Sequence, residues 1–316
     1  MHRRVLAAVA ALLFSSIAVA QQAPASSASA AIASSDAATP DLSAPLPDIQ
    51  TLLTHVRTRS DALESLRKNY ICTMTEVADE FSSDGSKKTH TDQYQIFYVG
   101  NTPVSQHLSR DGKPLSSEDA KKEQERVDKL VTKLKSHEDK PEKEEIHLTA
   151  VLKAASFSNP RREIIDGRPT LVFDYKGNPD AKPSNLGEEI IRHLSGTLWI
   201  DERDEAIVRV TGNLDDNFHV GGGLFVNIKK GSWFNYNQSI VNGEIWFPSQ
   251  LTLHADGRFL LLKGFNSDAR QTYSDYRKLK TSVTILPGTQ VLDEVESPTA
   301  DPSPAPVTPA NPPKSQ

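Results

Sequence analysis

The residues of this chain that could do chemistry are its histidines, its clustered acids and its single cysteine. Histidine binds metals and transfers protons near neutral pH. None of the histidines follows an H-x-H or H-E-x-x-H spacing, which would bring two metal ligands together locally. The sequence therefore predicts no local metal site and no cofactor, although distant strands could still assemble one. Beyond the first twenty residues the histidines are His55, His90, His107, His137, His147, His193, His219 and His254.

The acidic run from Asp201 to Glu205 could supply paired carboxylates for general acid and base catalysis. It lies in a predicted turn, where acids are normally solvated, so we interpret it as a surface turn. The chain has no G-x-S-x-G motif and no S-x-x-K motif in a suitable setting. We therefore predict a protein that is not an enzyme and keep an unrecognised hydrolase as the third hypothesis.

Cys72 is the only cysteine, so the chain forms no intramolecular disulfide. Its neighbours Ile71, Thr73 and Met74 are typical of a buried strand. We favour a core residue over a reactive thiol because a free cysteine often packs as a small apolar side chain.

The first twenty residues have the pattern of a secretory signal peptide. Arg3 and Arg4 form the basic end, an apolar run extends from Val5 to Ile17, and small residues precede cleavage near Ala20. No cysteine follows the cleavage point, so no lipid anchor is expected there. The sequence predicts a periplasmic or secreted protein.

Composition divides the remaining chain into one folded part between two disordered ends. Residues 21–46 are an Ala/Ser/Pro linker and residues 293–316 are a proline-rich tail. Segments with so few apolar residues cannot offset the conformational entropy lost on folding. We expect a single domain over residues 47–292.

Charge and hydropathy exclude two classes of protein. The net charge is −5, and no long basic stripe is present, which argues against a nucleic-acid binder. After the signal peptide no apolar run approaches the ~20 residues needed to cross a bilayer.

The elements that must position any site are mainly strands. A helix with an apolar stripe begins at residue 47, and strand patterns follow it up to about residue 110. Residues 116–158 are expected to be a helical insertion, with a polar first helix on the outside and a more apolar second helix over the sheet. Residues 161–280 again have strand patterns, separated by Asn-Gly and Asp-Gly turns. Glycines 221–223 are interpreted as a bend within a strand.

This order predicts an α+β fold. Its centre is a large curved antiparallel sheet, an unclosed β-barrel, with the N-terminal helix and the inserted helical pair covering it.

Three segments resemble a known family: residues 196–210, residues 241–253 and residues 273–278. They are similar to the periplasmic lipoprotein-carrier or lipoprotein-sorting superfamily (LolA/LolB-like). The resemblance implies an initial helix laid against an unclosed β-barrel whose concave side holds acyl chains. No functional residue of that family matches a position here, so none is transferred.

Aromatic and aliphatic strand residues are the candidates for lining such a concave side, with an ordinary two-sided core as the alternative. Alternation does not settle which of them point inward, because a shift of one residue exchanges the faces. The candidates are Tyr94, Ile96, Tyr98, Phe173, Tyr175, Trp199, Phe225, Trp233, Trp246, Phe259 and Leu261.

We therefore predict an exported, monomeric carrier or chaperone that binds lipid, an acylated protein or another hydrophobic ligand. An envelope protein is its expected second partner. The alternative is a module of the same fold that binds or senses an envelope protein, which the charged helix and the proline-rich tail favour. Whether the helix over residues 116–138 is a lid stays open.

Overall fold

The computed structural model describes residues 42, 44–100, 102–136, 149–184, 186–220, 226–259 and 263–279. The predicted signal peptide, most of the predicted linker, the glycine run 221–223 and the proline-rich tail lie outside these residues. None of the helices in the described part combines the length and the apolar character needed to cross a membrane.

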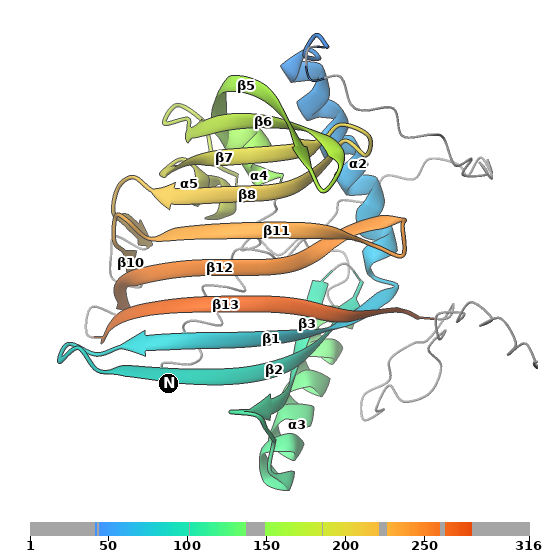
Figure 1. The fold of residues 1–316 in the computed structure, drawn as a ribbon. Coiled ribbons are helices and arrows are strands. Elements are labelled where there is room, and N and C mark those ends of the chain that lie inside the picture. Colours follow the sequence, from blue (N-terminus) through green and yellow to red (C-terminus); the bar gives the residue numbers. More distant parts are fainter. Residues whose placement is uncertain are drawn as a thin grey trace, which may run out of the picture.

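Strands dominate the described chain, as the sequence predicts (Figure 1). The helices are α2 (Ile49–Arg67), α3 (Ser117–Lys135), α4 (Ala150–Ala154) and α5 (Leu186–Ile191). The first strands are β1 (Tyr70–Phe81), β2 (Lys87–Val99), β3 (Thr102–Arg110), β4 (Lys113–Pro114), β5 (Ala155–Ile165) and β6 (Arg168–Gly177). The later strands are β7 (Leu194–Asp201), β8 (Ala206–Leu214), β9 (Phe218–Val220), β10 (Val226–Ile228), β11 (Trp233–Val241), β12 (Ile245–Phe259) and β13 (Lys263–Lys278).

All thirteen strands belong to one antiparallel sheet. Its order is β4-β3-β2-β1-β13-β12-β11-β8-β7-β6-β5, with β9 and β10 attached beside β12. Strands β4 and β5 are the two edges and do not pair with each other, so the sheet is not closed. This confirms the predicted unclosed antiparallel sheet of an α+β fold.

The ladder register assigns side chains to two faces, because directly paired residues of neighbouring strands point the same way. We call the face that carries Phe173 the inner face and the opposite one the outer face. One row of the inner face crosses the sheet through Phe173, Leu198, Val210, Tyr236, Leu251, Gln271, Glu76 and Asp92.

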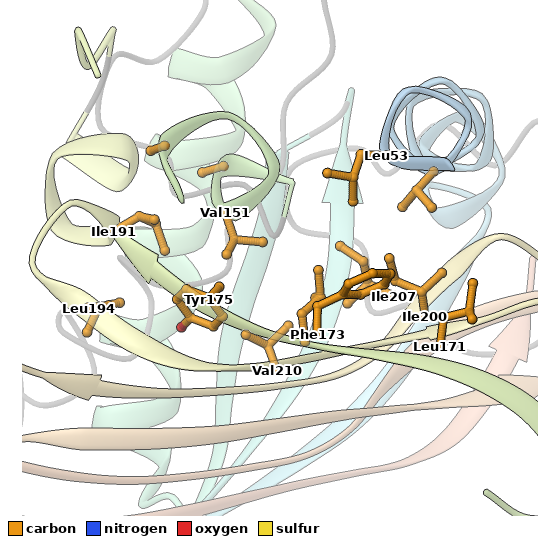
Figure 2. Packing of buried hydrophobic residues seen from close by; sticks show 14 of the residues in the cluster. Leu53, Val151, Leu171, Phe173, Tyr175, Ile191, Leu194, Ile200, Ile207 and Val210 are labelled. Carbon is orange, nitrogen blue, oxygen red and sulfur yellow. The ribbon is translucent and has the colours of Figure 1, made fainter. Parts of the chain in front are cut away.

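Three helices pack on the inner face at the β6–β8 end of the sheet (Figure 2). Leu53 of α2 and Val151 of α4 point toward the sheet, where Phe173 and Tyr175 lie buried. Ile191 of α5 joins the same cluster. This is the main hydrophobic core.

Helix α3 packs on the outer face, at the other end of the sheet. Val127, Val131 and Leu134 contact a cluster that includes Phe97 and Val104. Phe97 alternates with Ile96 along β2 and therefore faces away from the inner face. The two helices of the predicted insertion thus do not cover the sheet together: α4 lies on the inner face and α3 on the outer face. Strand β5 also begins at Ala155, inside the segment expected to be helical.

The start of α2 is tied to the sheet by polar contacts. Asp48 caps the helix by accepting a hydrogen bond from the Thr51 amide at 2.9 Å. The Arg162 guanidinium of edge strand β5 donates to the carbonyl oxygen of Ala44 at 2.7 Å. His55 lies 3.1 Å from Glu205 in the β7–β8 turn. These contacts hold α2 over the β5–β8 end.

Glycines let aromatic rings lie flat on the inner face next to the helices. Tyr175 is paired with Gly196, which is paired with Gly212, which is paired with Phe234. A Cβ atom at Gly212 would lie 2.3 Å from a ring carbon of Phe234. The Phe234 ring therefore occupies the space that a side chain at position 212 would take.

We expect Gly212→Ala to destabilise the protein by about 1–3 kcal/mol, because the added methyl overlaps the Phe234 ring. Urea unfolding measures the loss. Gly264→Ala in β13 is the matched control, since its Cβ would lie 3.8 Å from the nearest atom. An equal loss in both variants would contradict overlap with the Phe234 ring as the cause.

Candidate functional site

The inner face between β11 and β2 is the candidate site. Tyr236, Leu251, Leu253, Ala255 and Ala269 form a buried apolar cluster there. Among the described residues this cluster contains only strand residues, whereas the core over β6–β8 includes three helices. The cluster itself is thus built from strands, and the C-terminal end of α2 lies nearby, where Arg67 donates to the carbonyl oxygen of Trp246 on β12.

Strand β2 supplies a second wall of the same face. Tyr94, Ile96 and Tyr98 alternate along it and are half-buried. Their register partners on β1 include Met74 and Cys72, which are buried. Three of the predicted lining residues therefore share the inner face with the apolar cluster.

Two tyrosines of this face, Tyr236 on β11 and Tyr98 on β2, influence each other's ionisation. Burial raises the pKa of Tyr236, Arg67 lowers it, and the phenol of Tyr98 raises it further. Strands β12, β13 and β1 lie between these two tyrosines in the sheet. A sheet that curls toward its inner face brings such phenols closer together than a flat one.

A polar row crosses the concave face next to the apolar cluster. The Gln271 amide donates to Glu76 at 2.6 Å, and the Tyr273 hydroxyl donates to the Gln271 oxygen at 2.9 Å. Asp92 pairs directly with Glu76 in the β1–β2 ladder. Glu76 and Asp92 are 6% and 7% exposed, so two carboxylates share a nearly buried site.

The charge of Asp92 is compensated by its neighbours. His107 Nε2 lies 2.9 Å from the Asp92 carboxylate, and Arg110 Nε lies 3.7 Å from it. The His107 ring also stacks on Tyr94, with ring centroids 4.7 Å apart. Asp92 therefore lies in a cluster with one histidine and one arginine.

Glu76 has no cationic partner of this kind. Its carboxylate makes no ion pair within the described chain, and its hydrogen bond comes from a neutral amide. Burial raises the pKa of Glu76, the Gln271 hydrogen bond lowers it, the nearby Asp92 raises it further, and His107 lowers it. The site thus holds a buried carboxyl group that forms no ion pair within the described chain and whose protonated form is favoured.

The inner-face polar residues Glu76, Asp92, His107 and Gln271 were not predicted from the sequence. The alternation of residues along the strands carried a signal for them. Glu76 continues the series Cys72, Met74 on one side of β1, and Asp92 begins the series that Tyr94 continues on one side of β2. An acid in the inward position of an otherwise apolar series is expensive to bury unless it has partners. Only the register shows that these two acids are neighbours.

The other predicted lining residues lie elsewhere. Phe173 and Tyr175 are on the inner face but under α2 and α4 (Figure 2). Trp199 lies on the outer face beneath the Arg209 guanidinium, and Trp233 is on the outer face with 41% exposure. Trp246 donates to Asp204 at 2.9 Å. Phe225 and Leu261 lie outside the described residues, as does the side chain of Phe259.

The acidic turn is structural and not simply solvated, which corrects the sequence interpretation. Asp201 is 1% exposed and accepts hydrogen bonds from the Arg168 guanidinium at 2.5 and 2.7 Å. Its carboxylate also accepts from the backbone amides of Arg203 and Asp204. Alternation could not reveal this because the partner, Arg168, is contributed by β6.

We expect Arg168→Met to destabilise the protein by about 3 kcal/mol, because it leaves the buried Asp201 carboxylate without its cation. Chemical denaturation measures this change. Arg161→Met is the control: Arg161 bridges the well-exposed Glu163 and Asp174, where ion pairs contribute about 1 kcal/mol or less. Equal losses in the two variants would contradict the special role of the buried pair.

Cys72 is buried, and burial raises the pKa of its thiol to about 12. A thiol in this environment stays protonated and is a poor nucleophile. No group of three or more histidine, cysteine or acidic side chains in the described ranges is arranged to hold a metal ion.

A separate cavity of about 330 Å³ lies between α4 and α5. Its buried acid, Glu188, accepts hydrogen bonds from the amide and hydroxyl of Ser184 and lies 3.4 Å from Lys153. These contacts cap α5 and satisfy the Glu188 carboxylate.

Replacement of the buried carboxylate gives a pH-dependent prediction. Because the folded-state pKa of Glu76 is raised, the folded state keeps a proton that the unfolded state releases, and rising pH lowers stability. We expect Glu76→Gln to have a higher melting temperature than the wild type at about pH 7. The difference should vanish below the ordinary glutamate value of 4.5, where both states are protonated.

Thermal unfolding across this pH range tests the prediction. Glu80→Gln is the matched control, because Glu80 lies on the same strand and face but near the strand's end. A lower stability of Glu76→Gln at neutral pH would mean that the carboxylate is net stabilising.

Comparisons with known proteins give structural neighbours only. No protein-family model matches the chain, and no curated protein matches it in sequence. A putative outer-membrane lipoprotein-sorting domain from Vibrio parahaemolyticus is similar at 9% identity and a TM-score of 0.31, over 74% of this chain and 94% of that one. A LolA superfamily protein from Nitrosomonas europaea is similar at 11% identity and a TM-score of 0.26, over 72% and 94%.

A DUF1329 family protein from Desulfovibrio piger is similar at 10% identity and a TM-score of 0.31, over 72% of this chain and 91% of that one. The first two structures carry the family description that the sequence resemblance names. The architecture of this chain itself rests on its own strand order and register.

Proposed function

We propose that this chain is an exported, non-enzymatic carrier whose concave inner face between β11 and β2 holds the acyl chain of an amphiphilic ligand. The observation that carries the proposal is the buried apolar cluster around Leu251 and Leu253, which includes no helix residue of the described chain. The signal-peptide pattern at residues 1–20 supports action in the periplasm.

The arrangement of helices favours a chain-binding role. Helices α2, α4 and α5 fill the inner face over β6–β8, and α3 lies on the outer face. Each methylene removed from water contributes about 0.8 kcal/mol, so a chain of ten methylenes gains ~8 kcal/mol before ordering costs. For a ligand with such a chain, we propose that this hydrophobic contribution dominates the binding free energy.

The position of α3 also bears on the alternative function. Its outward side carries exposed charged residues, including Lys121, Lys122, Glu125 and Lys129. It packs on the face opposite to the proposed ligand, so it is a candidate surface for an envelope protein rather than a lid. A carrier that delivers its ligand to such a partner would use both faces, and we propose the protein to act as a monomer.

Mass spectrometry of organic extracts from the gently purified protein tests the carrier function. We expect a stoichiometric lipid or acylated molecule, and expect Ile96→Asn to reduce its occupancy severalfold, because a polar side chain in the wall disfavours an acyl chain. Ile96 is half-buried, so the variant should remain folded.

Ile164→Asn is the matched control, since Ile164 is 42% exposed on edge strand β5. Occupancy there should equal that of the wild type. A protein that carries no ligand and takes up none from lipid vesicles would refute the carrier function and favour the protein-binding module.

A further inference from the structure

We propose that the cavity between α4 and α5 is a second binding site, which takes a phosphate monoester. Its volume of about 330 Å³ is at the lower end of the range of small-molecule sites. Lys153 of α4, Glu188 of α5 and the loop residues Asn178, Lys182 and Ser184 line it. None of its described lining residues belongs to the apolar cluster of the inner face, so this inference does not depend on the carrier function.

The hydrogen bonds inside the cavity use its side-chain acceptors and leave nitrogen donors. Glu188 Oε2 accepts from the amide and the hydroxyl of Ser184, each at 2.8 Å, and Glu188 Oε1 lies 3.4 Å from Lys153 Nζ. The side-chain oxygen of Asn178 accepts from a backbone amide of the loop at 3.0 Å. Within the part of the chain that the structure describes, the Lys182 amine and the Asn178 amide nitrogen have no such partner. A site of this kind suits a ligand that accepts hydrogen bonds.

The charges of the lining favour an anion. Its two lysines stand against one glutamate, which leaves one positive charge in excess. Beside the cavity, Arg192 pairs with Glu189 at 2.8 Å, so these two charges offset each other. Asp180 lies in the same loop but does not line the cavity. Lysine ammonium groups bind phosphate as point charges.

Glu188 keeps the lysine of α4 at the cavity. The Glu188 residue is 5% exposed. Burial raises its pKa, but the hydrogen bonds from Ser184 and the charge of Lys153 lower it below the ordinary glutamate value overall. Glu188 therefore stays ionised at neutral pH, where it positions Lys153 and has little capacity for a further donor.

The loop that forms the cavity is fixed by hydrogen bonds at both ends. The Asn178 amide donates to the carbonyl oxygen of Ala154 at 2.8 Å, and the Arg192 guanidinium donates to the carbonyl oxygen of Pro179 at 2.6 Å. Ser184 closes the other end through Glu188. A site that is already ordered loses less conformational entropy when it binds a ligand.

The count of donors selects a phosphate monoester among small anions. Such a group has three acceptor oxygens and a charge of about −1.5 to −2 at neutral pH. The cavity offers nitrogen donors on Lys153, Lys182 and Asn178. A carboxylate has fewer oxygens and a smaller charge, and a neutral polyol gains nothing from the excess positive charge.

Isothermal titration calorimetry of the purified protein tests the proposal with glycerol 3-phosphate, glycerate and glycerol. We expect glycerol 3-phosphate to bind more tightly than glycerate by at least about threefold, and glycerol to give no measurable binding. Lys182→Gln should weaken binding of glycerol 3-phosphate by about fivefold, the upper range for an exposed charge pair. Lys182 is exposed, so this variant should keep the melting temperature of the wild type.

Sedimentation with vesicles separates a soluble ester from a lipid head group. The probes are phosphatidylcholine vesicles with and without phosphatidic acid, whose head is a phosphate monoester. Retention by phosphatidic acid that glycerol 3-phosphate relieves would assign the site to a lipid. Binding of glycerol 3-phosphate without such retention would assign it to a soluble ester.

Lys176→Gln is the matched control, because Lys176 is exposed and alternates with Tyr175, which places it on the outer face. It should bind glycerol 3-phosphate as the wild type does. Equal affinities for glycerate and glycerol 3-phosphate would overturn the phosphate assignment. A wild type that binds neither glycerol 3-phosphate nor phosphatidic acid, or binding that Lys182→Gln leaves unchanged, would overturn the site. The carrier function has its own readout, the lipid content of the purified protein.

Discussion

The organisation of this molecule depends on one continuous antiparallel ladder that runs from β5 to β4 across the sheet. Side chains alternate along each strand, so the register decides the face of every strand residue. Phe173 in the helix-covered core and Glu76 in the polar row belong to the same row of the inner face. A single geometric rule therefore places a hydrophobic core and a candidate binding site on one surface.

The helices divide that surface unequally. Helices α2, α4 and α5 complete a conventional core over β6–β8, while α3 braces β1–β3 from the outer face. The apolar cluster between them is built from strand residues. Glycines at positions such as 212, where a ring occupies the space of a side chain, allow the inner face to stay close-packed while the sheet curves.

The concave face combines two opposed properties. Its apolar cluster is buried among strands, whereas the nearby Glu76 carboxyl group is costly to bury and is held by the Gln271 amide. The acidic turn at Asp201 illustrates the contrast: there an equally buried carboxylate has a bidentate arginine and backbone donors. The two acids therefore differ in their partners: Asp201 has a bidentate arginine, whereas Glu76 has the neutral amide of Gln271.

The sequence by itself determined the fold class, because alternating strand patterns, Asn-Gly turns and an initial apolar helix are local signals. It also identified Tyr94, Ile96 and Tyr98 as residues of one strand face. Only the tertiary structure decided that this face is the concave one, that α3 lies on the other side, and that Glu76 neighbours Asp92. Those facts depend on which strands pair and in what register, and pairing between residues far apart in the chain leaves no local pattern for a reader of the sequence.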